Sequence, residues 1–138
     1  MKPVVGLVES KSHYDGVLKA LSLIENQIAE EIKGKKKVLI KPNFVSTSRQ
    51  LAATHVDAVR AVLDFLEKHY SGKVIIGEGP SVSSLRSGLI NFGYLWLQDK
   101  YDVEFVDLNR DDYIEVEGYD SRLRPLKFRL SKTAVESD

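Results

Sequence analysis

The sequence of 138 residues contains no cysteine. Disulfides, thiolate nucleophiles and iron–sulfur clusters held by this chain are therefore excluded, because each needs a cysteine sulfur. The sequence also lacks an excess of charge of either sign, since its 20 basic and 20 acidic residues cancel. Nucleic-acid binders carry a strong positive field, so the composition argues against a nucleic-acid partner.

Long apolar runs are missing as well. Nowhere do about 18 consecutive apolar residues occur, so the sequence predicts no membrane-spanning helix and no membrane partner. The apolar stretch within residues 1–8 is too short for a signal peptide and lacks a small-residue cleavage site; we interpret it as a first strand. A chain with these features is expected to be soluble and cytoplasmic.

Several catalytic and nucleotide-binding motifs are also absent. The sequence has neither the GxxxxGK[ST] spacing of a P-loop nor GxGxxG, and it has no HExxH, CxxC or GxSxG. The reaction class, and whether there is a reaction at all, therefore stays open.

Apolar strands alternate with amphipathic helices along most of the chain. Strands are predicted at 37–41, 73–77 and 103–108, and helices at 12–34, 54–72 and 83–93. This alternation predicts an α/β fold, a three-layer Rossmann-like, mainly parallel sheet with helices on both faces. A length of 138 residues fits a single domain over residues 1–138.

The C-terminal part follows a different pattern. Ile114 and Val116 alternate with charged residues, as do Leu126, Phe128 and Leu130 after the turn-prone segment 118–121. This pattern predicts a C-terminal β-hairpin with one wet face. A helix begins near residue 131 without a closing element, which is typical of the N-terminal part of a longer domain.

Polar residues follow the predicted strands. In an open parallel sheet, ligands bind beyond the carboxyl ends of the strands, where Lys41, Asn43, Glu78, Ser81 and Asp107 are expected. Lys41 could pair with a carboxylate or phosphate, and Asn43 could both donate and accept hydrogen bonds. The alternative is a strand exit in which proline stiffens the loop and asparagine satisfies backbone groups.

Thr54 and His55 open a helix eleven residues after Asn43, and Thr54 is expected to bind the ligand at the same edge. His55 could be a general base, an anion contact or a metal ligand, or an ordinary exposed residue. A metal site would need His55, Glu78 and Asp107 to converge from separate strand ends.

The segment 77–81 joins a strand to a serine-rich helix start. Such a loop can present backbone N–H groups and hydroxyls to an anion, with Gly79 and Ser81 as contacts. Glu78, held between two glycines, is open to close approach by a substrate or metal and is, with His55, a candidate for acid–base catalysis. The alternative is a tight loop that only caps the next helix.

Four motifs in order resemble the family called domain of unknown function 362: residues 38–43, Thr54–His55 before an apolar helix, residues 74–80, and residues 134–138. The resemblance covers almost the whole chain. It implies that a full family domain continues past residue 138 into another strand, so the second half of a site would lie there. Some family members carry appended ferredoxin-like modules, whose cysteines this chain lacks.

The chain more distantly resembles the N-terminal domain of nickel-dependent lactate racemase in its order of strand, polar loop, helix and glycine loop. That family uses histidines and a cofactor-attached lysine. Here the glycine loop has no histidine, and the region of the cofactor lysine lies beyond residue 138.

Two functions remain open. The first is the binding portion of a cytoplasmic enzyme or redox-associated protein, which holds a small anionic ligand or a metal-bearing cofactor and is not catalytically complete alone. The second is a non-catalytic assembly module that uses the hairpin edge to bind a second copy or a missing C-terminal half.

Overall fold

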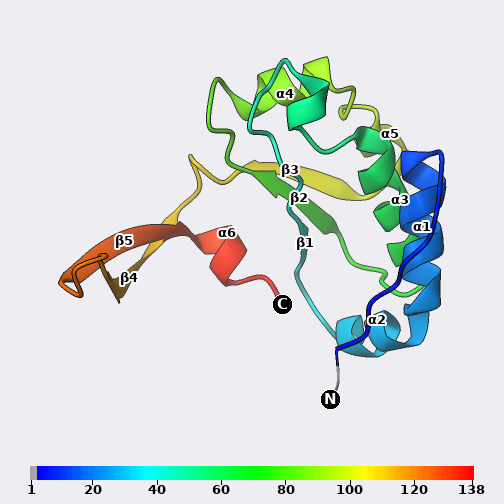
Figure 1. The fold of residues 1–138 in the computed structure, drawn as a ribbon, viewed down its shortest axis with the longest axis horizontal. Helices are drawn as coiled ribbons and strands as arrows, with labels where there is room; N and C mark the ends of the chain where they lie inside the picture. Colours follow the sequence, from blue (N-terminus) through cyan, green and yellow to red (C-terminus); the bar gives the residue numbers. More distant parts are fainter. Residues whose placement is uncertain (1–2) are drawn as a thin grey trace.

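The computed structural model describes residues 3–138 and has an α/β fold (Figure 1). Three parallel strands, β1 (Val38–Ile40), β2 (Val74–Glu78) and β3 (Val103–Asp107), form a sheet in the order β1-β2-β3. The central strand β2 is largely buried, whereas β1 and β3 are mostly half-buried. The three predicted strands are thereby confirmed to within two residues at each end.

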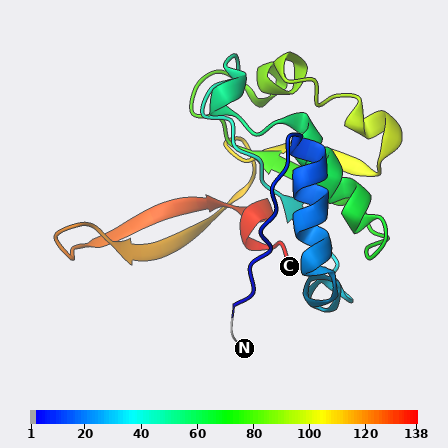
Figure 2. The same cartoon turned by 45° about the vertical axis from the view of Figure 1, so that its right-hand side comes forward.

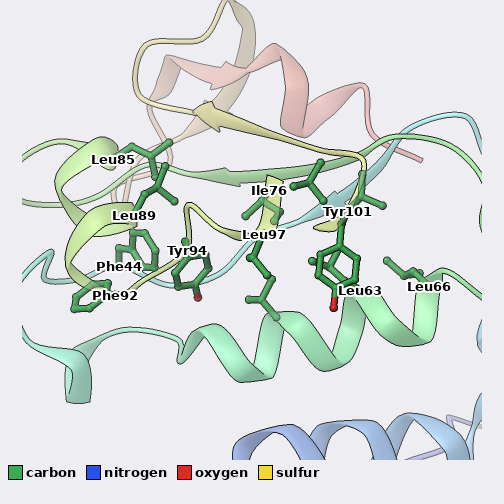
Figure 3. Close-up of a cluster of buried hydrophobic side chains, with 13 residues drawn as sticks. Phe44, Leu63, Leu66, Ile76, Leu85, Leu89, Phe92, Tyr94, Leu97 and Tyr101 are labelled. Carbon is green, nitrogen blue, oxygen red and sulfur yellow. The ribbon is translucent and has the colours of Figure 1, made fainter. Parts of the chain in front are cut away.

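The connections between these strands are helical. α3 (Val56–Leu66) joins β1 to β2, and α4 (Leu85–Asn91) and α5 (Leu97–Lys100) join β2 to β3. Crossovers of the same hand in a sheet of sequential order lie on the same face. Figure 3 shows α3 and the core side chains on one side of the sheet. The predicted helical layers on both faces are therefore not confirmed.

Aromatic side chains fill the core on this face. Phe44 and Tyr94 have no exposed surface, and the Phe44 ring makes edge-to-face contacts with the rings of Phe92 and Tyr94. Figure 3 shows these three rings beside Leu85 and Leu89 of α4. Phe44 thus anchors the chain just after β1 and fixes where the polar residues before it lie.

The predicted N-terminal strand is wrong for residues 3–8, and Met1 and Lys2 of that prediction lie outside the described residues. This segment pairs with no strand, and Val5 and Leu7 are exposed. It runs along α1 (His13–Leu23) instead (Figures 1 and 2). Gly6 approaches α1 so closely that a Cβ atom there would lie 2.5 Å from the carbonyl oxygen of Ala20.

The helix predicted over 12–34 is divided in two. α1 ends at Leu23, because the φ of −122° at the next residue, Ile24, is not helical, and α2 (Glu25–Ile32) follows at once. The N-cap predicted at Ser12 is present, since its side chain accepts a hydrogen bond from the Asp15 N–H. The helix therefore starts as predicted, and the break at Ile24 carries no glycine or proline signal.

The predicted C-terminal hairpin is confirmed. β4 (Tyr113–Tyr119) pairs with β5 (Pro125–Ser131) in a separate antiparallel sheet that projects from the body (Figures 1 and 2). α6 (Lys132–Val135) follows, and Asp138 fastens this end of the chain to the start of β1 by accepting hydrogen bonds from the N–H groups of Lys36 and Lys37. Within residues 3–138, none of the helices is both long and apolar enough to cross a bilayer.

Candidate functional site

A lysine and a buried glutamate meet at the carboxyl ends of β1 and β2. Lys41 directly follows β1 and Glu78 is the last residue of β2, and Lys41 Nζ lies 2.5 Å from Glu78 Oε2. The Glu78 side chain is only 5% exposed, whereas that of Lys41 is 56% exposed. The other carboxylate oxygen, Oε1, accepts a hydrogen bond from the Phe44 N–H. The pair thus has a buried anionic end and a cationic end at the surface.

Tyr94 lies close enough to this pair to be affected by it. Burial, and then the negative charge of Glu78, raise the pKa of the Tyr94 phenol well above its usual value of about 10. Its hydroxyl donates a hydrogen bond to the Thr54 carbonyl at 2.9 Å. Tyr94 therefore stays protonated and serves as a donor that holds the loop after β1.

Asn43 and Thr54 are brought together by that loop. The Asn43 N–H donates to Thr54 Oγ1 at 2.9 Å, and the Thr54 N–H donates to the Asn43 carbonyl at 2.8 Å. The Asn43 side chain donates to the Ala52 carbonyl at 3.5 Å. Asn43 therefore acts in closing the loop, and Thr54 also lies at the edge of a pocket.

His55 occupies the N-cap position of α3. Its Nδ1 accepts a hydrogen bond from the Asp57 N–H at 3.1 Å, so the neutral ring carries its proton on Nε2. The ring also stacks on that of His13, with 4.5 Å between the ring centroids. These contacts give His55 a helix-capping role.

The third strand end is linked to the loop after β2 through Asn109. The Asn109 side chain donates to the Pro80 carbonyl at 2.9 Å, and its N–H donates to Asp107 Oδ1 at 3.1 Å. Asn109 also lies so near Gly79 that a Cβ atom there would be 2.6 Å from the amide oxygen. Ser81 is exposed beside this linkage. The sequence analysis missed Asn109, although it follows β3 as Asn43 follows β1.

A metal site is not assembled from these residues. Within residues 3–138, no three His, Cys, Asp or Glu side chains lie close enough together to hold a metal ion. The structure therefore does not bring His55, Glu78 and Asp107 together as a metal site.

A small pocket lies beside Lys41, between α1, α3 and the end of β1. Its volume is about 150 Å³, and it is lined mainly by apolar side chains: Val17, Ile40, Lys41, Pro42, Thr54, Ala58, Val59 and Val62. A larger pocket of about 380 Å³ opens at the amino ends of β2 and β3, lined in part by Val74 and Val103. Ligands of parallel sheets bind at the carboxyl ends, so the smaller pocket is the better candidate.

Comparison with known proteins adds a family and one distant relative. The family described as Domain of unknown function (DUF362) matches residues 38–138, which is more than half of the chain. The thylakoid-associated protein sll1697 of Synechocystis sp. is 29% identical over 140 residues, which cover 97% of this chain and 42% of that protein. The chain thus spans less than half the length of this relative. No solved structure matches.

Proposed function

We propose a function from the premise that this chain belongs to the DUF362 family: its strand ends bind a small anionic ligand, with Lys41 as the contact. The observation that carries the proposal is the Lys41–Glu78 pair. A carboxylate that is 5% exposed holds a lysine that is 56% exposed, at the edge where parallel sheets bind ligands.

The lysine keeps capacity for a ligand. An ammonium group has three N–H donors. Two of those of Lys41 point to Glu78 Oε2 and to the Pro42 carbonyl, at 2.5 and 3.3 Å. The third donor is available to an anion that approaches from the exposed side. Glu78 serves to hold the ammonium in place, because its own oxygens are buried behind it.

The proposal is tested by NMR titration of the chain with acetate and with phosphate. Lys41→Met removes the charge while keeping much of the side chain, and the double variant Lys41→Met/Glu78→Gln does so without leaving a buried carboxylate alone. Lys73→Met is the matched control, because Lys73 is 55% exposed, pairs with Asp102 and lies before β2 at the opposite end of the strand. Loss of anion-dependent shifts in both Lys41 variants and not in the control is the expected result. Equal shifts in all of them would refute the proposal.

The projecting hairpin favours a second function, an assembly module. Its apolar side chains Leu126, Phe128 and Leu130 are 49, 42 and 41% exposed, and in residues 3–138 β4 and β5 pair only with each other. Unpaired strand edges with an apolar face are templates for strand addition from a partner.

Sedimentation velocity over a range of protein concentrations tests this second function. Phe128→Ser is expected to weaken self-association, whereas Lys127→Ser on the charged face is the control and leaves it unchanged. A chain that is monomeric at every concentration would argue against a second copy as the partner.

Cytoplasmic residence is proposed because a chain without cysteine fits a reducing compartment. The relative named as thylakoid-associated suggests a thylakoid-associated location as the alternative, which cell fractionation would distinguish. A metal-bearing cofactor stays a less supported ligand, because the described residues offer no cluster of three metal-binding side chains. None of the comparisons supports the distant resemblance to lactate racemase, so racemase activity is not proposed.

A further inference from the structure

We propose that the anion bound at Lys41 is a short-chain aliphatic carboxylate, whose hydrocarbon chain fills the pocket between α1, α3 and β1. This inference rests on the proposed function and adds the ligand class. It is carried by the position of Lys41, which contributes both to the ion pair with Glu78 and to the lining of the apolar pocket.

The side chains that form the walls of the pocket are apolar. Val17 comes from α1, Ile40 from the end of β1, and Ala58, Val59 and Val62 from one face of α3. None of these side chains has a polar atom. Burial of a ligand CH₂ group against them is favourable, whereas burial of a polar group would leave it without a partner.

The volume limits the length of the chain. The pocket holds about 150 Å³. An engineered apolar cavity of about that volume takes benzene, so about six carbon atoms fill the space. A carboxylate of four to six carbons therefore fits, whereas a longer chain would extend into solvent and gain little.

The rim of the pocket offers donors to a carboxylate. Lys41 keeps one N–H, and Thr54 Oγ1 accepts from the Asn43 N–H, so the hydroxyl proton of Thr54 stays free to be donated. The Thr54 carbonyl already accepts from the Tyr94 hydroxyl. Two donors, one of them charged, favour a carboxylate over a neutral alcohol or amide.

The experiment is an NMR titration of the valine methyl groups of Val17, Val59 and Val62 with acetate, butyrate, hexanoate and octanoate. Each buried CH₂ is expected to lower Kd about four-fold, so Kd falls about fifteen-fold from acetate to butyrate and again to hexanoate. Octanoate is expected to bind no more than about two-fold better than hexanoate. With 1-hexanol as the probe, binding is expected to be weaker and insensitive to the Lys41→Met/Glu78→Gln substitution.

Variants that change the pocket provide the second readout. Ala58→Leu fills it and is expected to raise Kd for hexanoate at least ten-fold and Kd for acetate much less. Ala29→Leu, the same substitution on α2 outside the pocket, is the control. Should Ala58→Leu fail to fold, Val62→Ala enlarges the pocket and is expected to shift the best ligand towards octanoate.

The outcomes separate this inference from the proposed function. If carboxylates bind through Lys41 with a Kd that does not depend on chain length, the inference is overturned while the anion site stands. If no anion binds at Lys41, both are overturned. A chain-length dependence that Ala58→Leu leaves intact would also overturn the inference, because the hydrocarbon would then lie elsewhere.

Discussion

Removal of either partner of the Lys41–Glu78 pair is expected to have unequal effects on stability. Lys41→Met leaves a carboxylate that is 5% exposed with one remaining partner, the Phe44 N–H. Stranding a buried charge in this way costs about 3–5 kcal/mol. Because the lysine end of the pair reaches solvent, water can partly replace the ammonium, and we expect about 2–4 kcal/mol.

Glu78→Gln is expected to cost less. The glutamine oxygen can still accept the hydrogen bond from the Phe44 N–H, and the lysine that loses its partner is 56% exposed and remains hydrated. A cost of about 1 kcal/mol follows from the loss of one charge-assisted hydrogen bond. The double variant Lys41→Met/Glu78→Gln strands no charge, so it should be more stable than Lys41→Met alone.

Urea unfolding followed by circular dichroism measures these differences. With a slope of about 2 kcal/mol per molar urea, Lys41→Met shifts the midpoint by about 1–2 M and Glu78→Gln by about 0.5 M. The double-mutant cycle is expected to give a coupling energy of about 2 kcal/mol. If the two single variants lost equal free energies of unfolding, and these losses added in the double variant, the buried Glu78 carboxylate would not need the Lys41 ammonium. That result would refute the reasoning.

Three further predictions concern the support of the site. Burial raises the pKa of the Asp64 carboxyl, but hydrogen bonds from Tyr101, Tyr14 and Lys100 outweigh it and hold that pKa below its usual value. The resulting stability is present above about pH 4 and is lost as the pH falls through the folded-state pKa. In urea unfolding, Asp64→Asn should therefore cost about 2 kcal/mol at pH 7 and less at pH 3. Gly88→Ala places a Cβ atom 2.8 Å from the buried Phe44 ring, so thermal unfolding should show a loss of about 1–3 kcal/mol. His55→Asn keeps an N-cap acceptor, so the free energy of unfolding in urea should change by less than about 0.5 kcal/mol, and acetate binding should be unchanged. A loss of acetate binding without a loss of stability would show that His55 contacts the ligand.

The sequence predicted those elements whose signals are local. The Val- and Ile-rich strands and Gly93, which ends the α4 region with a φ of +68°, are such cases. Residues 4–8 have the same apolar composition as a strand, yet they have no partner strand and lie along α1. Whether a partner strand is present depends on contacts between distant parts of the chain, which local composition does not predict. The covering of only one face by the crossovers likewise follows from strand order, which a sequence pattern leaves open.

For the candidate site, the strand ends predicted that Lys41 and Glu78 lie close together, but not which hydrogen bonds their neighbours make. Lys41 and Glu78 do meet, since parallel strands end at a common edge. Asn43, Thr54 and His55 share that edge, but the Asn43 N–H is used by Thr54 Oγ1 and His55 Nδ1 is used by the Asp57 N–H. The pocket wall from Val17 could not be expected, because it depends on how α1 packs against α3.

Energetics connect the ion pair to the pocket. An exposed ionic contact contributes about 1 kcal/mol at most, so a bare anion at Lys41 would bind with a Kd above about 0.1 M. Lys41 also divides its hydrogen bonds between Glu78 and the ligand, which limits the contact further. About five buried carbons at about 0.8 kcal/mol each would add about 4 kcal/mol, which would bring Kd to about 1 mM or somewhat below. Useful affinity at this strand end therefore has to come from the apolar pocket, with Lys41 setting the charge and orientation of the ligand.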